Sequence, residues 1–512
     1  MSNYKMETKC VQGGYTPGNG EPRQIPIIQS TTFKYATSED MGKLFDLEAS
    51  GYFYTRLQNP TNDSVAAKIC DMEGGTAAML TSSGQAANFF AIFNIASCGD
   101  HIVSSSSIYG GTFNLFSVTM KKMGIDFTFV SPDCTEDELR AAFRPNTKAL
   151  FGETIANPAL TVLDIELFAK VAHENGVPLI IDNTFATPVN CRPFEWGCDI
   201  VTHSTTKYMD GHGAAVGGCI VDSGKFDWTK YPEKFPGLCT PDDSYHGVTY
   251  TERFGLEGAF ITKATAQLMR DFGSIPAPMN CYLLNVGLET LSLRMAKHCA
   301  NAQSVAEYLQ KHPKIAWVKF AGLCTPDESY HGVTYTERFG LEGAFITKCT
   351  AQLMRDFGAI PAPMNAYLLN VGLETLPLRM AKHCENGLTV AKYLQAHPKV
   401  AWVRFPGLEG DSQYELAQKY MPNGTCGVVS FGVKGGRKAA ETFMAGLKLA
   451  SIATHVADAK TCVLHPASAT HRQMNDAELA AAGISPDLVR FSVGIEDVKD
   501  LIADIENALA NV

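Results

Sequence analysis

Short apolar runs alternate with amphipathic stretches along the first half of the chain. The runs HIVSSSS, DFTFVS, TKALFGE, VPLIIDN and DIVTHST have the length and the β-branched content of strands. Between them, stretches such as EDELRAAF and DIELFAKVAHENG space their apolar residues as helices do. This alternation predicts an α/β fold, in which a large, mostly parallel sheet carries helices on both faces.

The C-terminal part of the chain repeats this pattern on a smaller scale. From about residue 427 it contains the apolar runs GVVSFGV and LVRFSVGIE, an amphipathic stretch between them and a final helical pattern. We therefore expect a small C-terminal α/β domain in addition to the larger one.

An internal repeat lies between these two parts. Residues 235–319 recur as residues 320–404, and about five positions in six are identical. FPGL opens the first unit, FAGL opens the second, and FPGL follows it, as after a slip between two similar strings. Each unit reads as helix, helix and a short strand, which is IAWVKF in the first. Two near-identical units are too few for a solenoid, so we interpret the repeat as a tandem duplicated helical segment.

Charge and composition narrow the kinds of partner. The net charge is -10 and the chain has no block of Lys and Arg, which disfavours nucleic acids and anionic membranes. The first residues lack the basic and apolar regions of a signal peptide, and no run of about 18 apolar residues follows. The 15 cysteines are scattered without a CxxC or a Cys/His quartet, so we expect reduced thiols and no metal site. These features predict a cytoplasmic protein with small-molecule substrates.

Two polar residues each follow or close a predicted strand and so are expected at one edge of the predicted sheet. Lys207, in HSTTKYMDGHG, follows the apolar run DIVTH, and Asp182 closes the run VPLIID. Alone, the lysine reads as a solvated surface residue and the aspartate as a turn or capping residue. Together, at the carboxyl ends of parallel strands, they favour a site where a carboxylate pairs with a cation such as a protonated pyridine nitrogen.

A helix start supplies the complementary feature for an anion. In TSSGQAANFFAIF, the small residues Ser82, Ser83 and Gly84 precede a helical pattern and let the main chain approach a phosphate. A plain N-cap is the alternative interpretation. Ser204 and Thr206 flank the lysine with hydroxyl groups that can reach the same phosphate. Tyr109, in SSIYGGT, has a ring that can stack on a flat cofactor, although a core or loop tyrosine is the more common case.

Two other motifs near Lys207 are rejected. Residues 204–207 spell S-x-x-K, as in penicillin-binding serine hydrolases, but the companion motifs S-D-N and K-T-G are missing from the sequence. GHGAAVG at 211–217 weakly resembles a dinucleotide-binding loop, yet it follows no clear strand-to-helix turn and lacks the downstream acid of that motif. We interpret it as a flexible loop behind the lysine.

At these residues the sequence resembles the Cys/Met-metabolism family of pyridoxal-phosphate (PLP) enzymes. The motifs that carry the resemblance are YTRLQNPT, SSGQAA, YGGT, ETIANP, IDNTFATP, THSTTKYMDGH and LVRFSVGIED. The resemblance covers essentially the whole chain except one copy of the repeat. The resemblance implies the aspartate aminotransferase-like, type I fold of PLP-dependent transferases.

The resemblance also implies roles for single residues. Lys207 would hold the cofactor as a Schiff base, and Asp182 would pair with the pyridine nitrogen. Tyr109 would stack on the ring, with Asn157 beside the cofactor and near the substrate. Arg490 would clamp the substrate carboxylate, for which the guanidinium geometry is suited.

The phosphate and the proton transfers involve further residues that the resemblance implies. The phosphate would be held on one side by the amides of Gly84 and Gln85 and the hydroxyls of Ser204 and Thr206. Tyr54 and Arg56 would reach the phosphate of a neighbouring subunit, so that the site forms in a homodimer or homotetramer. Tyr109 and Tyr54 would assist proton movements near the leaving group.

The domain layout follows from the resemblance and the repeat together. We expect an N-terminal arm over residues 1–60 that contacts the neighbouring subunit, and a PLP-binding domain over residues 61–280. Residues 281–365 would be extra material from the duplication, and residues 366–512 the small domain. Which copy of the repeat fills the native position stays open.

Two details favour one branch of the family. Gly111 stands where methionine γ-lyases have a cysteine after YG, and the stretch 235–273 is long, as in O-acetylhomoserine sulfhydrylases. The resemblance then implies a γ-replacement in which O-acetylhomoserine and sulfide give homocysteine and acetate. Cystathionine γ-synthase and methionine γ-lyase activities stay open, as does an inactive PLP-binding protein impaired by the duplication.

Overall fold

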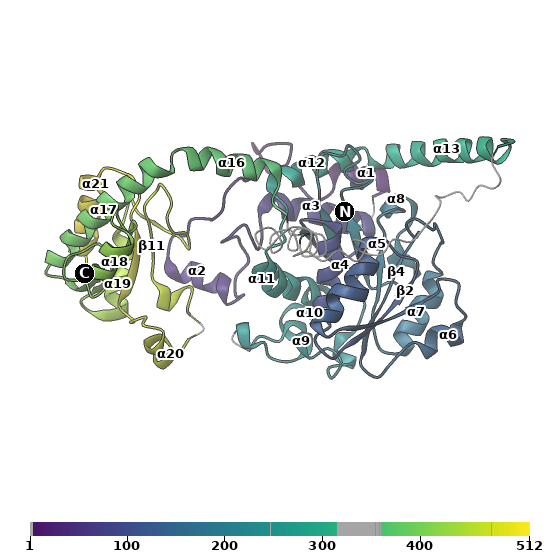
Figure 1. Cartoon of the computed structure of the whole chain (residues 1–512), viewed down its shortest axis with the longest axis horizontal. Coiled ribbons are helices and arrows are strands. Elements are labelled where there is room, and N and C mark those ends of the chain that lie inside the picture. Colours follow the sequence, from purple (N-terminus) through teal and green to yellow (C-terminus); the bar gives the residue numbers. More distant parts are fainter. Residues whose placement is uncertain (1–3, 246, 315–353, 355–357, 359, 473) are drawn as a thin grey trace, which may run out of the picture. The chain divides into compact units, whose positions relative to one another are not determined.

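Two β-sheets organise the computed structural model (Figure 1), which describes all residues except 1–3, 246, 315–353, 355–357, 359 and 473. Contacts divide the chain into two units. Unit 1 comprises Met1–Gln29, Arg56–Pro241 and Val248–Ala362. Unit 2 comprises Ser30–Thr55, Asp242–Gly247 and Pro363–Val512. Each unit is described by itself.

The sheet of unit 1 has seven strands in the order β1-β7-β6-β5-β4-β2-β3. The strands are β1 (Ala77–Thr81), β2 (His101–Ser105), β3 (Asp126–Val130), β4 (Thr147–Glu153), β5 (Leu179–Asp182), β6 (Ile200–Ser204) and β7 (Gly218–Asp222). The five predicted apolar runs form β2 to β6, which pair in parallel. The sequence pattern did not predict β1 and β7. Strand β7 pairs antiparallel with β1 on one side and with β6 on the other. The predicted α/β fold with a mostly parallel sheet is confirmed.

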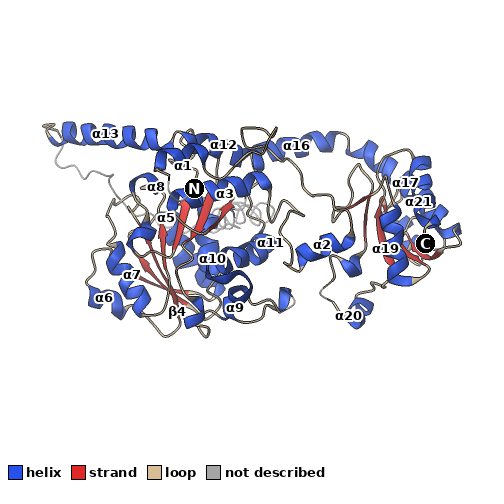
Figure 2. Ribbon diagram, turned by 180° about the vertical axis from the view of Figure 1, so that it is seen from behind, coloured by secondary structure: helices blue, strands red, loops and turns tan. Residues whose placement is uncertain are grey.

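Helices flank both sides of this sheet (Figure 2). They are α1 (Met6–Gln12), α3 (Pro60–Glu73), α4 (Gly84–Phe93), α5 (Gly110–Asn114), α6 (Glu136–Ala141), α7 (Ile165–Glu174), α8 (Thr187–Asn190), α9 (Pro236–Cys239), α10 (Tyr250–Lys263), α11 (Arg270–Phe272), α12 (Pro278–Glu289) and α13 (Leu291–Gln310). Local sequence sets their ends. In α3, the Asn59 side chain caps the first turn, and Gly74 ends the helix with a left-handed φ of 82°.

Unit 2 is built on a five-stranded sheet in the order β10-β11-β12-β9-β8. Its strands are β8 (Val400–Arg404), β9 (Val428–Val433), β10 (Ser451–Ile452), β11 (Cys462–Leu464) and β12 (Leu488–Ser492). Its helices are α2 (Ser38–Phe45), α16 (Pro363–Glu374), α17 (Leu376–Ala396), α18 (Tyr414–Tyr420), α19 (Gly436–Gly446), α20 (Asp476–Ala481) and α21 (Val498–Ala510). Buried side chains of α17, α19 and α21 pack with those of β9 and β12 in one core.

The two copies of the repeat are only partly within the described residues. In the first copy, α10 to α13 are described, whereas the predicted strand IAWVKF lies outside the described residues. In the second copy, α16, α17 and β8 are described, and β8 is the predicted strand. Among the helices that the structure describes, none has the length and apolarity needed to cross a bilayer.

Candidate active site

A cavity of ≈ 260 Å³ opens in unit 1 where three parallel strands end. Glu153, Asp182 and Ser204 are the last residues of β4, β5 and β6, and all three line it. Parallel strands end at the same edge of a sheet, so residues far apart in sequence meet there. The predicted site residues that line the cavity are Gly84, Gln85, Tyr109, Asn157, Asp182, Ser204, Thr206 and Lys207.

Lys207 stands on the turn that follows β6. Its main-chain N–H bonds to the carbonyl oxygen of Ser204, and its own carbonyl accepts the N–H of Gly211. These bonds fix the backbone of the turn while the side chain is exposed and lines the cavity. A primary amine is thus presented to the cavity from a held main chain.

Asp182 is buried and held by three hydrogen bonds. Its Oδ2 accepts from Nδ2 of Asn88 at 3.0 Å, and its Oδ1 accepts from the main-chain N–H and the hydroxyl of Thr184 at 3.0 and 2.5 Å. Asn88 is held in turn, because the hydroxyl of Thr202 donates to its Oδ1 at 2.6 Å. The carboxylate is therefore fixed in the cavity wall before any ligand binds. The sequence reading missed Asn88 and Thr184.

The start of α4 approaches β6 closely at Gly84. A Cβ placed on Gly84 would lie 2.4 Å from Cβ of Ser204, so only glycine allows this contact. Ser83 caps the helix, with its hydroxyl oxygen accepting the N–H of Ala86 at 3.1 Å. The first amides of a helix, with its positive dipole end, make a place for an anion. Both the N-cap and the anion interpretation therefore describe the same turn.

The remaining predicted residues on the cavity are held by neighbours. Gln85 donates to the carbonyl oxygen of Gly111 at 3.1 Å, and Thr206 donates to that of Gly217 at 3.2 Å. Tyr109 caps α5 and is half exposed. Asn157 follows β4 in a loop, on the cavity wall.

Glu153 is a further carboxylate on the cavity, in the predicted motif ETIANP but without an assigned role in the sequence analysis. Its Oε1 accepts the N–H of Tyr109 at 2.6 Å, and its Oε2 accepts the N–H of Asn157 at 3.0 Å. Burial, with a smaller contribution from the charge of Asp182, raises the pKa of Glu153 to about 8. Its position at a strand end, like that of Asp182, was the signal that could have identified it.

Three predicted residues are not among those that line this cavity. Arg56 belongs to unit 1, where its Nη1 donates to the carbonyl oxygen of Arg270 at 2.6 Å. Tyr54 belongs to unit 2 and forms an isolated bridge with Thr32. Arg490 lies in β12 of unit 2, where its Nη2 donates to the carbonyl oxygens of Thr454 and His455.

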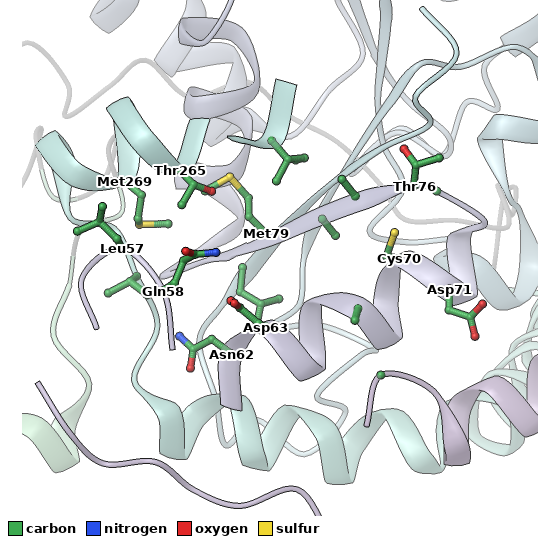
Figure 3. Close-up of a pocket in the computed structure, with 18 of the residues that line it drawn as sticks. Leu57, Gln58, Asn62, Asp63, Cys70, Asp71, Thr76, Met79, Thr265 and Met269 are labelled. Carbon is green, nitrogen blue, oxygen red and sulfur yellow. The ribbon is translucent and has the colours of Figure 1, made fainter. Parts of the chain in front are cut away.

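A larger cavity in unit 1, of ≈ 600 Å³, is lined by different residues (Figure 3). Its lining includes Asn62, Asp63 and Asp71 of α3, together with Thr265 and Met269. None of the predicted site residues belongs to its described lining. Size alone does not identify a site, and the smaller cavity has the convergent polar groups that a binding site needs.

One cavity, at the carboxyl edge of a mostly parallel sheet, is lined by an amine, a fixed carboxylate and a helix that starts at a glycine. These features define an α/β enzyme built to hold an aromatic phosphate cofactor. The chain belongs to the Cys/Met metabolism PLP-dependent enzyme family, whose model matches residues 7–348 and 341–510. The two matched segments together extend over nearly the whole chain. The fold is accordingly the α/β type I fold of PLP enzymes.

Curated relatives resemble the chain over its whole length. O-acetyl-L-homoserine sulfhydrylase of Leptospira meyeri is 38% identical over 512 residues, covering 100% of this chain and 98% of the relative. Homocysteine synthase of Schizosaccharomyces pombe is 39% identical over 506 residues, covering 98% of each. A crystal structure of a Campylobacter jejuni protein described as an O-acetylhomoserine (thiol)-lyase has a TM-score of 0.54 and 29% identity, and covers 99% of this chain and 100% of its own. That structure contains a pyridoxyl phosphate group joined to a lysine.

The residues around the smaller cavity fit pyridoxal phosphate in their chemistry. A lysine amine matches the aldehyde, a buried carboxylate matches the pyridine nitrogen, and helix amides with nearby hydroxyls match the phosphate. Gly84 lets the start of α4 approach Ser204 at the end of β6, so the helix start and this hydroxyl border the same cavity.

Proposed function

We propose that the protein catalyses a γ-replacement in which O-acetylhomoserine and sulfide give homocysteine and acetate. The observation that carries the proposal is one cavity that gathers Lys207, Asp182 and the start of α4. It occurs in a chain 38% identical to an O-acetyl-L-homoserine sulfhydrylase along its full length. The reaction belongs to methionine and cysteine biosynthesis.

The buried carboxylate sets the electronic state of the site. Bound PLP supplies an electron sink for the bonds at the substrate Cα. Asp182 keeps a proton on the pyridine nitrogen by placing a negative charge beside it. The hydrogen bonds from Asn88 and Thr184 hold its two oxygens in place, so little reorganisation is needed when the ligand binds.

Lys207 is the proposed proton carrier. With the substrate bound, Nζ of Lys207 would act as a free base that moves protons between Cα and Cβ of the substrate. The fixed main chain at Gly211 and Ser204 limits the positions that this amine can reach. The phenol oxygens of Tyr109 and, from a neighbouring subunit, Tyr54 assist proton movement at the leaving acetate.

Arg490 is the proposed clamp for the substrate carboxylate. Burial lowers the pKa of its guanidinium below the ordinary value, and its Nε has no hydrogen-bond partner among the described residues. A buried donor without a partner is unfavourable, and a bidentate carboxylate would satisfy it. Asn157 lines the cavity and is proposed to contact both substrate and cofactor.

Gly111 supports the sulfhydrylase over the methionine γ-lyase. With the ring of Tyr109 where it lies, a Cβ at position 111 would be 2.5 Å from Cε1 of that ring. A cysteine at position 111 therefore requires a different place for the Tyr109 ring. Cystathionine γ-synthase activity is the second candidate, since the pocket can accept a related γ-substituted amino acid.

The test is turnover of O-acetylhomoserine with sulfide, cysteine and methanethiol in parallel, with the product identified by mass spectrometry. We expect homocysteine with sulfide, and at least about a 100-fold lower kcat for Lys207→Ala, the loss typical of a missing acid–base group. Cystathionine formed in preference to homocysteine would reassign the reaction. A holoprotein that turns over O-acetylhomoserine with none of the three nucleophiles would indicate a PLP-binding protein that has lost activity.

We also propose that the active site is shared between subunits of a cytoplasmic homodimer or homotetramer. Tyr54 and Arg56 would then act on the cofactor phosphate of the adjacent subunit. Mixing inactive Lys207→Ala with inactive Arg56→Ala subunits should restore activity, because a hybrid dimer contains one site with both native residues. Failure to recover activity after verified subunit exchange would contradict a shared site.

The repeat is proposed to add about 85 residues beyond what the enzyme needs. The proposed layout keeps residues 1–60 as the arm, 61–280 as the PLP domain and 366–512 as the small domain. Deletion of residues 281–365, the proposed extra material, should leave cofactor binding unchanged or improved, measured from the absorbance of bound PLP. Loss of binding after this deletion would count against the proposal.

A further inference from the structure

Glu153 sits where two carboxylates meet at the floor of the cavity. It is the last residue of β4, pairs in register with Asp182 of β5, and is only 6% exposed. Burying two carboxylates side by side is unfavourable, because each disfavours the charged form of the other. A glutamine would fill nearly the same volume without a charge, so the retained carboxylate calls for a reason.

The two oxygens of Glu153 bind two separate segments of the cavity wall. One oxygen accepts the N–H of Tyr109, which precedes α5, and the other accepts the N–H of Asn157, in the loop after β4. The N–H of an N-cap residue has no partner inside its own helix. A carboxyl group has two oxygens that can each accept one such bond, whereas an amide has a single oxygen and an NH2 group that only donates.

We propose that Glu153 is a positioning residue, which fixes Tyr109 and Asn157 around the cofactor and acts on the reaction through them. Its effect on turnover rests on the proposed function, whereas the restraint on the two amides does not. An amide at this place leaves one of the two segments without its bond, because it has only one acceptor oxygen. The ring of Tyr109 and the side chain of Asn157 then lose their fixed distance from the reacting atoms.

The pKa of Glu153 gives its burial a measurable consequence. Burial and Asp182 raise the pKa of Glu153 to about 8, and the titratable groups that share the described cavity lining with it are Tyr109, Asp182 and Lys207. Because the folded pKa is raised above the ordinary value of 4.5, the stability contributed by the protonated form is lost as pH rises through about 8.

Asp222 provides a matched control. It closes β7, is buried, and has a pKa raised to about 8 by burial, but it pairs with Ala77 and is not among the described residues that line the cavity. Its Oδ1 accepts the N–H of Gly224 at 2.9 Å. The thermal stability of the wild-type protein should therefore fall as the pH rises from 6 to 9. Both Asp222→Asn and Glu153→Gln should make this fall smaller.

Hydrogen exchange on the holoprotein separates the two variants. For Glu153→Gln we expect exchange at the amide of Tyr109 or Asn157 to quicken about 10-fold, as for loss of one bond to a charged acceptor. Asp222→Asn should leave both amides unchanged. The circular dichroism of the bound cofactor should change only in Glu153→Gln. The kcat of Glu153→Gln should fall about 10- to 100-fold, because a displacement of about 1 Å in a positioned group is sufficient for such a loss.

Unchanged exchange at both amides in a folded Glu153→Gln holoprotein would overturn the proposal. If Glu153→Gln fails to fold, Glu153→Asp keeps the charge but is too short to span both amides, and it should show the same faster exchange. Absence of wild-type turnover with O-acetylhomoserine would refute the proposed function alone, because exchange and dichroism read the restraint without turnover.

Discussion

The two copies of the repeat place nearly the same sequence in opposite surroundings. In unit 1, α12 from the first copy packs against α3, and Leu284 is 4% exposed. The equivalent helix of the second copy, α16, has no buried residue, and Leu369 at the same position is 65% exposed. One sequence thus serves as a core helix in one copy and as an exposed helix in the other.

The following helices show the reverse. In unit 2, α17 from the second copy packs against β8, β9 and α21, with Val390 fully buried. In α13 of the first copy, the equivalent Val305 is 56% exposed. Of these four helices, α12 of the first copy belongs to the core of unit 1 and α17 of the second copy to the core of unit 2, while α13 is buried only near its start, at Leu291 and Met295.

The few positions that differ between the copies agree with this division. Gly387 in α17 has Gly427 and Cys426 within 3.2 Å of a would-be Cβ, and the first copy has Ala302 there. Leu388 packs against the core of unit 2, where the first copy has Gln303. Burial thus follows from fit to a neighbour, since local helix propensity is almost the same in both copies.

The largest expected effect separates Leu284 from Leu369. Leu284→Ala removes a buried side chain from α12 and should destabilise unit 1 by about 2–5 kcal/mol. Leu369→Ala, the same change in α16, should alter stability by about 0.5 kcal/mol or less. Urea unfolding of both variants measures the difference. Equal losses would mean that α12 and α16 exchange places.

A smaller effect is expected at the buried asparagine of α17. Asn386 donates to the carbonyl oxygens of Gly494 and Glu496 at 3.0 and 2.8 Å, whereas its counterpart Asn301 is exposed. Asn386→Ala should destabilise unit 2 by about 2 kcal/mol, because two buried acceptors lose their donor. Asn301→Ala is the control, with about 0.5 kcal/mol or less. A larger loss for Asn301→Ala in thermal unfolding would assign α13 to the core instead.

The smallest effect is a change of sign at Gly387. In an exposed helix, Gly→Ala stabilises by about 0.5–1 kcal/mol through backbone entropy. At Gly387 the added Cβ meets main-chain atoms, and overpacking of about 1–3 kcal/mol outweighs that gain. Gly387→Ala should therefore lower the thermal midpoint, with Gly372→Ala in the exposed α16 as the stabilising control. A rise in both thermal midpoints would mean that steric fit at Gly387 is not the reason why α17 of the second copy occupies the core of unit 2.

The sequence predicted those parts of the molecule that depend on local pattern. The strands β2 to β6 follow from apolar runs, and Lys207 and Asp182 follow from their places at the ends of two such runs. Parallel pairing then implies that strand ends share an edge. Family and cofactor followed from motifs, and both are confirmed.

Contacts between residues that are far apart in the sequence could not be predicted from local patterns. Asn88 holds Asp182 from 94 positions away, and Glu153 holds Tyr109 from 44 positions away, so no local spacing reports either bond. Strand β1, at one edge of the sheet, pairs antiparallel with β7, and the βα alternation does not signal this pairing. The roles of Tyr54, Arg56 and Arg490 stay predictions, because they require a second subunit or a substrate.

Borohydride reduction of the purified holoprotein, followed by peptide mass mapping, tests the proposed cofactor site most directly. Reduction makes the bond between the cofactor and its lysine permanent, so the added mass marks the attached residue. We predict the mass of pyridoxyl phosphate on the peptide that contains Lys207. An unmodified Lys207 peptide, with the cofactor mass on another lysine, would contradict it.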